Sequence, residues 1–162
     1  MSWQNRIIGE GMEAPENLLA NPLNFRVHPQ FQQDALKGLL SEVGWVQRVI
    51  VNQRTGFVVD GHARVSLAMR DGIPEVPVLY VDLSEREEAL VLAALDPIGA
   101  LAGTDNDQLR ELMERVSTGD PALQQLLDDL ATSASIVPPV EQTGDGDGGS
   151  GEKHCPHCGG IL

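Results

Sequence analysis

The sequence predicts an α+β domain in which a small mixed sheet is packed by helices. Two short runs rich in β-branched residues, 46–52 and 57–60, flank a Gln-Arg-Thr-Gly turn, a pattern typical of a β-hairpin. The hairpin lies between two segments with helical apolar spacing, 29–43 and 62–71. With 162 residues, 41% of them hydrophobic, the chain can bury one good core with appendages, and two full domains are not expected.

The segments before the hairpin carry their own start and stop signals. Residues 1–27 mix loop signals with short apolar pieces, so we expect one strand and a turn there. The first helix has Pro29 in its first position and ends at Gly44. It bears one apolar stripe at four-residue spacing: Phe31, Ala35, Leu39 and Val43.

The predicted domain closes with one strand and one helix. The apolar run 75–83 has the length of a strand and is flanked by turn and cap signals. Ser84 and Glu87 form an S-x-x-E capping box that opens a helix through about Leu95. Pro97 is expected to end this helix, because proline lacks the N–H that a helix interior needs.

Two acidic helices and a linker follow. The helices are expected from Asp105 or Asn106 to about Val116, and from Asp120 to about Leu130. The composition then changes to Pro, Gly, Ser and acids, as in flexible linkers. We therefore divide the chain into a domain over 1–95, an acidic helical extension over 96–132, a disordered linker over 133–153 and a metal-knuckle tail over 154–162.

The charge of −13 is unevenly distributed. Residues 1–72 carry seven bases and seven acids, whereas residues 73–132 carry three bases and thirteen acids. Such a field repels polyanions, so a phosphate site must be local and lie in the first half, and DNA binding by the acidic helices is not expected. No apolar run approaches the roughly 20 residues that cross a bilayer, and the N-terminus lacks a leader pattern, so we expect a cytoplasmic protein with no membrane contact.

Residues 60–64, Asp-Gly-His-Ala-Arg, join the second strand of the hairpin to the helix that ends at Gly72. A glycine here permits close approach of a ligand to the backbone, and the helix start offers unpaired N–H groups to an anion. Arg64 adds a forked donor suited to phosphate, and His62 adds a ring that can donate a hydrogen bond or carry a proton. The corner therefore favours an anionic ligand.

A purely structural interpretation of this corner is also open. Asp60 would repel a phosphate unless it turned away, capped the helix or helped to hold a metal ion. Arg64 could simply pair with Asp60 or with Glu75, and a single G-x-x-R is a weak motif.

The run from about Asn24 to Leu95 resembles the N-terminal domain of the ParB/sulfiredoxin superfamily. The segments that carry the resemblance are NFRVHP, GWVQRVIVNQRTGFVVDGHARVSLAMRDGIPEVPVLYVDL and SEREEALVLAALD. More narrowly, it is similar to the ParB-like (ParB-like nuclease) domains of phages and mobile elements, which are often fused to or encoded beside DNA adenine methyltransferases. The resemblance implies the α+β fold with a small mixed sheet.

The corner separates the two branches of the superfamily. In ParB proteins it reads G-E-R-R and holds nucleotide phosphates, and Gly61 and Arg64 keep the first and last positions of that motif. In sulfiredoxins it reads G-C-H-R, with a catalytic cysteine where this chain has His62, so sulfiredoxin activity is not expected. The E-N-x-x-R segment of CTP-hydrolysing ParB proteins is also missing, because Asp96-Pro97 stands in that region without an arginine.

The resemblance implies a phosphate- or nucleotide-binding set. Arg26 and His28 would converge on the corner, which gives the expected binding residues Gly61, His62, Arg64, Arg26 and His28. The ligand would be a nucleotide, with magnesium as a possible companion, or a nucleic-acid phosphate. The expected role is accessory to phage or mobile-element DNA modification or processing, with a DNA methyltransferase or other DNA-processing protein as partner and a homodimer as a possible assembly.

Two other function classes are open. The first is an enzyme, a nucleotide triphosphatase or nuclease that uses Asp60 and a divalent ion beside His62, although one Asp and one His do not make a two-metal site. The second is a protein-interaction module without catalytic activity, in which the acidic helices dock a basic partner.

The C-terminal KHCPHCGGIL resembles one half of a zinc ribbon. Cys155 and Cys158 have the C-P-x-C-G spacing of a metal knuckle. Zinc prefers four ligands, so His154 or His157, a second chain or a partner would complete the shell. We expect a zinc site here; the alternatives are a truncated relic of a longer ribbon and an unliganded reactive pair of cysteines.

Overall fold

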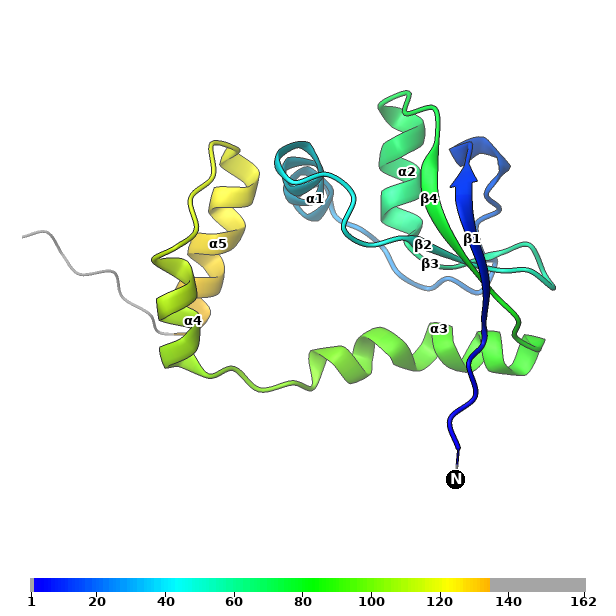
Figure 1. The fold of residues 1–162 in the computed structure, drawn as a ribbon. Helices are drawn as coiled ribbons and strands as arrows, with labels where there is room; N and C mark the ends of the chain where they lie inside the picture. The colour runs from blue at the N-terminus through cyan, green and yellow to red at the C-terminus, as the bar shows by residue number, and fades with distance from the viewer. Residues whose placement is uncertain (1, 135–162) are drawn as a thin grey trace, which may run out of the picture.

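The computed structural model describes residues 2–134, which form a mixed four-stranded sheet with helices around it (Figure 1). The strand order is β1-β4-β2-β3, with β4 antiparallel to β1 and parallel to β2, and β2 antiparallel to β3. The predictions of a small mixed sheet and of a hairpin are confirmed. The strands are β1 (Ile7–Glu13), β2 (Val49–Asn52), β3 (Val58–Asp60) and β4 (Val76–Val81).

The helices occur where the capping and spacing signals indicate them. A 3-10 turn, η1, follows β1 at Pro15–Asn17. Five helices complete the described residues: α1 (Gln30–Glu42), α2 (His62–Arg70), α3 (Glu85–Ala100), α4 (Asn106–Met113) and α5 (Pro121–Ser133). In Figure 1, α2 lies beside the sheet, α1 and α5 lie side by side, and α3 runs as a long rod towards α4.

The core is built from β-branched side chains on one face of the sheet and from α2. Val49 and Val78 are neighbours in the parallel β2–β4 pair, and both have no exposed area. The cluster they belong to consists of Leu18, Val49, Val51, Val58, Val65, Ala68, Val76 and Val78. The partly buried Trp45 packs against this cluster. Stiff β-branched residues suit such a buried sheet because they lose little rotamer freedom there.

The start of α3 is fixed by a complete capping box. The Ser84 N–H donates to Glu87 Oε2 (2.8 Å), and the Glu87 N–H donates to Ser84 Oγ (3.4 Å). Arg6, just before β1, pairs with Glu87 from the other side. These hydrogen bonds from Ser84, together with the Arg6 guanidinium, lower the pKa of Glu87 to about 2.

One turn further along α3, Glu88 is buried in a polar network. Its carboxylate accepts hydrogen bonds from Asn21 Nδ2 (2.7 Å), Asn52 Nδ2 (2.5 Å) and Thr55 Oγ1 (2.6 Å). Glu88 is 4% exposed and Asn52 is fully buried. A buried carboxylate is tolerated only when its oxygens are satisfied, so this network fixes α3 against the sheet and against the chain before α1.

The helical extension folds back onto α1. Asp120 caps α5 by accepting from the backbone N–H groups of Ala122 (3.0 Å) and Leu123 (2.9 Å). Glu42, at the end of α1, accepts from the N–H of Gly119 (3.1 Å). A methyl group added at Gly38 would lie 2.6 Å from the Asp120 carboxyl, so the glycine lets the α5 cap approach α1 closely.

Two expectations from the sequence were wrong in detail. Pro97 does not end α3, which continues to Ala100 and so contains residue 95, the expected domain boundary. The Ala93 carbonyl that loses its hydrogen bond to Pro97 lies on an exposed stretch of helix, where water can satisfy it. The expected apolar stripe of α1 is buried only at Ala35, while Val43 is 61% exposed.

The helix α5 runs three residues past the expected Leu130, and the remaining expectations for the C-terminal part lie outside the described residues. These are the rest of the linker over 133–153 and the zinc knuckle with Cys155, Cys158, His154 and His157, which stay predictions. None of the described helices is long and apolar enough to cross a membrane.

We expect Glu88→Ala to lower the free energy of unfolding by about 3 kcal/mol, because the buried donors Asn21 and Asn52 and the partly buried Thr55 hydroxyl lose an acceptor at once. Urea denaturation of the full chain measures this. The matched control is Glu85→Ala, an exposed carboxylate on the same turn of α3, which should cost about 0.5 kcal/mol or less. Equal losses for the two variants would contradict a stabilising role for the network.

Candidate functional site

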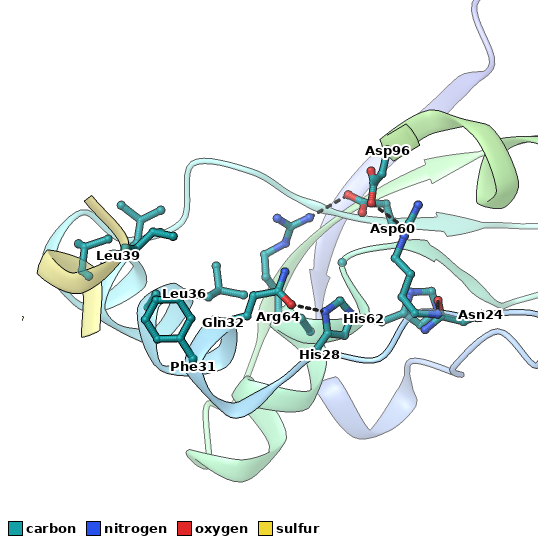
Figure 2. A pocket seen from close by; sticks show the side chains of 16 residues that line it. Asn24, His28, Phe31, Gln32, Leu36, Leu39, Asp60, His62, Arg64 and Asp96 are labelled. Carbon is teal, nitrogen blue, oxygen red and sulfur yellow. Dashed lines mark hydrogen bonds and ion pairs between the residues drawn. The ribbon is translucent and has the colours of Figure 1, made fainter. Parts of the chain in front are cut away.

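The six residues singled out from the sequence lie around one pocket of about 330 Å³. Gly61, His62 and Arg64 come from the start of α2, and Asp60 from the end of β3. The segment before α1 supplies the two others, Arg26 and His28. Figure 2 shows His28, Asp60, His62 and Arg64 with Asn24 and Asp96 at one end of this pocket. The volume falls within the range of small-molecule sites.

The corner depends on the backbone of Gly61. Its φ of +100° is left-handed, a conformation that glycine adopts without a steric penalty. A Cβ at this position would lie 3.2 Å from Val49 Cα, which is backbone and cannot rotate away. Gly61 therefore lets β3 turn directly into α2 while the chain passes close against β2.

The N-terminus of α2 has no side-chain cap. By contrast, α3, α4 and α5 begin with Ser84, Asp105 and Asp120, each of which accepts from the first-turn N–H groups. Since Gly61 has no side chain, the first-turn N–H groups of α2 are left for water or for a ligand, and the helix dipole makes this end favourable for negative charge.

Arg64 is held in an ion pair at the pocket. Its Nη2 lies 2.8 Å from Asp60 Oδ2, and its Nη1 donates to Gln47 Oε1 (2.8 Å). The side chains of Arg64 and Asp60 are 13% and 17% exposed, and Arg64 Nε is buried without an acceptor among residues 2–134. The pairing with Asp60 that the sequence left open is therefore present. An incoming anion would have to share Arg64 with this carboxylate.

Arg26 is likewise paired with a carboxylate. Its Nη1 lies 2.7 Å from Asp96 Oδ2, and its Nη2 approaches the Leu92 carbonyl (3.5 Å), both on α3. Asp96, which stands in the sequence region that lacks the arginine of the ParB-type segment, thus lies at the pocket. With Arg26 facing Asp96 and Arg64 facing Asp60, the polar end of the pocket is nearly balanced in charge.

His62 is oriented by the backbone of Asn21. The Asn21 N–H donates to His62 Nε2 (3.3 Å), so the neutral ring carries its proton on Nδ1. Burial lowers the pKa of His62 below its usual value. Asp60 raises this pKa in part, whereas the nearby His28 and Arg26 lower it. His62 is therefore a neutral donor at pH 7. His28 differs, since its ring bonds the exposed Gln32 side chain (3.1 Å).

Several pocket residues were not found from the sequence. Asp96 reaches the pocket through the fold, because it lies on α3. Gln47 and Asn21 do not line the pocket, but they hydrogen-bond two residues that do, Arg64 and His62. Leu123 and Leu126 of α5 also line the pocket. No local signal marks these positions, because polar and apolar side chains of this kind are common on any surface helix or loop.

The described part of the chain offers little to a metal ion. Within residues 2–134, no group of three or more His, Cys, Asp or Glu side chains is arranged to hold one. Asp60 and Asp96 are the carboxylates that a magnesium ion carried by a nucleotide would meet in the pocket. Magnesium keeps most of its ligands from water and phosphates in such sites, so two carboxylates are compatible with it.

A solved structure of similar fold is the C-terminally truncated chromosome-partitioning protein ParB from Caulobacter crescentus, complexed with CTP-γ-S. It aligns with a TM-score of 0.50 at 20% identity, over 76% of this chain and 79% of that chain. The fold is ParB-like. The crystal structure of a pNOB8-like ParB N-domain aligns with a TM-score of 0.47 at 18% identity, over 83% of this chain and 49% of its own.

Sequence comparison adds one short match outside the solved structures. Over 57 residues, the chain is 39% identical to the uncharacterized protein ORF326b of Acidianus two-tailed virus. This match spans 35% of the chain and 17% of the viral protein. No family model matches the chain. The comparisons therefore identify the ParB-like fold, and the ligand and role belong to the proposal below.

We expect Gly61→Ala to destabilise the chain by at least about 1 kcal/mol more than Gly72→Ala, as measured by urea denaturation. Both glycines have positive φ, so both variants carry the backbone strain of about 1–2 kcal/mol. At Gly72 no atom lies within 4 Å of the added Cβ, whereas at Gly61 the Cβ meets the Val49 backbone. Equal costs would show that close approach to β2 is unimportant.

We expect the His62 ring to titrate below pH 6.5, as followed by NMR. Because the folded-state pKa lies below the unfolded one, the unfolded state binds protons more readily as pH falls. Stability from neutral His62 is therefore complete above about pH 6.5 and is lost on acidification. Urea denaturation between pH 5 and 8 should show this loss reduced in His62→Gln. A ring pKa at or above 6.5 would contradict the burial argument.

Proposed function

We propose that this chain binds a phosphorylated ligand at the pocket over residues 60–64, in an accessory role in phage or mobile-element DNA modification or processing. The observation that carries the proposal is the convergence of Arg26, His28, His62 and Arg64 on the uncapped N-terminus of α2. Guanidinium groups, a neutral imidazole donor and free N–H groups are the partners that phosphate oxygens accept from. The CTP-γ-S complex of the ParB-like neighbour supports a nucleotide as the ligand.

The two carboxylates set the conditions for binding. A phosphate group must displace Asp60 and Asp96 from their arginines, or it must bring a cation that they can share. A ligand with several phosphate charges competes better than a single phosphate. Its electrostatic attraction to each arginine then exceeds the attraction that the arginine loses when its carboxylate partner is displaced. Magnesium bound to the ligand would relieve the same repulsion, so we expect binding to depend on it.

Hydrolysis is less well supported by the geometry. A nuclease or nucleotide triphosphatase needs a positioned water and, in many cases, two metal ions held by several carboxylates. The described pocket offers Asp60, Asp96, His28 and His62, and the first two are engaged by arginines. Binding is therefore the preferred proposal, with hydrolysis as the alternative.

A second candidate function is protein interaction, favoured by the second half of α3. Here three apolar side chains face solvent, with Leu95 50%, Ile98 65% and Leu101 83% exposed. Exposed apolar clusters of this kind mark contact surfaces. A DNA methyltransferase or other DNA-processing protein as partner, and a homodimer, remain predictions.

Thermal stability of the full chain with CTP, ATP, GTP or short DNA, each with and without magnesium, tests the proposed binding. We expect at least one of these ligands to raise the melting temperature, because a ligand that binds only the folded state stabilises it. Arg64→Ala should abolish the shift. Arg70→Ala, on the same helix but outside the pocket and 41% exposed in its side chain, should keep it.

The outcomes separate the candidates. No shift with any ligand would overturn the phosphate site and leave the interaction module. A shift in melting temperature that survives in both Arg64→Ala and Arg70→Ala would place the ligand elsewhere on the chain. Product release in the CTP, ATP or GTP samples would favour the hydrolase alternative.

A further inference from the structure

The core and α2 lie on one face of the sheet, and the opposite face also carries apolar side chains. These are Met12 of β1, Ile50 of β2, and Pro77 and Leu79 of β4. Ile50 is the neighbour of Leu79 in the parallel pair, and Met12 lies opposite Pro77 in the antiparallel pair. A sheet face that meets water normally has polar side chains at these positions. We call this surface, together with residues 45–48, the outer face.

The outer face is hollowed and has no helix over it. A hollow of about 680 Å³ is lined by Met12, Ile50, Pro77, Leu79 and residues 45–48. Within residues 2–134, all of these positions lie on strands or in the segment before β2. Met12 is 54% exposed and Val46 is 74% exposed, and the partly buried Trp45 stands between them and the core. Exposed apolar side chains gathered around a tryptophan are typical of protein contact surfaces.

One exposed ion pair lies on the outer face. Arg48 Nη2 is 2.9 Å from Glu10 Oε2, and the two side chains are 49% and 64% exposed. Glu10 is opposite Leu79 in the β1–β4 pair, so the ion pair lies beside the apolar hollow that Arg48 also lines. Such an exposed pair contributes little to the stability of one chain, and both groups keep polar atoms for a second partner. The outer face thus offers one base and one acid in balance.

The charge of the rest of the chain favours contact through this face. Residues 105–129 carry seven acids and two bases, and the whole chain has a net charge of −13. In Figure 1, α4 and α5 lie at the opposite end of the molecule from β1. Two copies that meet through their outer faces therefore keep their acidic helices far apart, where salt screens the repulsion between them.

We propose that the outer face is the contact surface of a two-fold symmetric dimer of this chain. In such a dimer the same patch meets itself, so Arg48 of each copy faces Glu10 of the other and the two hollows cover each other. A second copy fits better than a basic partner because the patch has no excess of acid. The hollow shares no lining residue with the pocket at residues 60–64, so the inference stands apart from the proposed phosphate site.

Analytical ultracentrifugation of the full chain tests the dimer, with a chelator present so that a zinc site shared through the tail does not contribute. We expect wild type to dimerise as its concentration rises. Val46→Glu should raise the dissociation constant at least about tenfold, because it places a charge in the apolar contact. The matched control is Val27→Glu, which is 88% exposed and does not line the hollow, and which should dimerise like wild type.

Two charge reversals test the two-fold pairing. Arg48→Glu and Glu10→Arg each set like charges against each other in the dimer, so each variant alone should raise the dissociation constant at least about tenfold. When the two variants are mixed in equal amounts, a glutamate meets an arginine at both contacts of the mixed dimer. The mixture should therefore recover dimerisation close to that of wild type.

The outcomes decide the proposal without touching the phosphate site. A monomer at every concentration would overturn the dimer and leave the outer face to a different protein. Equal weakening by Val46→Glu and Val27→Glu would overturn the choice of this face. Loss of the dimer in Leu101→Glu but not in Val46→Glu would do the same, because it would move the contact to the exposed end of α3. A mixture as weak as its two components would overturn the two-fold pairing.

Discussion

The buried carboxylate of Glu88 is the constraint on which the remaining arrangement depends. It takes hydrogen bonds from Asn21, in the chain before α1, and from Asn52 and Thr55, in the β2–β3 hairpin. Leaving any of these donors unpaired in the interior costs more than the bond itself contributes, so the network tolerates one relative placement of α3, the hairpin and the chain before α1. The backbone N–H of Asn21 then orients His62.

The resulting pocket contains both arginines that attract an anion and carboxylates that compete with it for those arginines. Arg26 and Arg64 attract anions, yet each is satisfied by Asp96 or Asp60 in the unliganded chain. Pairing with the two carboxylates reduces the repulsion between the two partly buried guanidinium groups. It also means that a ligand must bind the arginines more strongly than the carboxylates do. The uncapped start of α2 has no such competitor among the described side chains, which makes it the part of the site most ready for an anion.

Features that are set by near neighbours in the chain could be predicted. The hairpin and the Ser84–Glu87 capping box are confirmed, because turn geometry and capping involve residues within a few positions of one another. The prediction that Pro97 ends α3 was wrong. The sequence does not show that this stretch of α3 is exposed, where water can replace the lost hydrogen bond. The resemblance indicated Arg26 and His28, which the fold brings to the corner.

The sequence by itself determined the α+β class, the helix starts and the position of the strand-to-helix corner at residues 60–64. These follow from periodicity, capping and the backbone freedom of glycine. Only the tertiary structure decided what faces that corner. Asp96 and the α5 leucines reach the pocket across long stretches of chain, by packing of α3 and α5 that no local pattern encodes. Whether Arg26 meets a carboxylate or a free surface depends on that packing, because its partner Asp96 lies on α3.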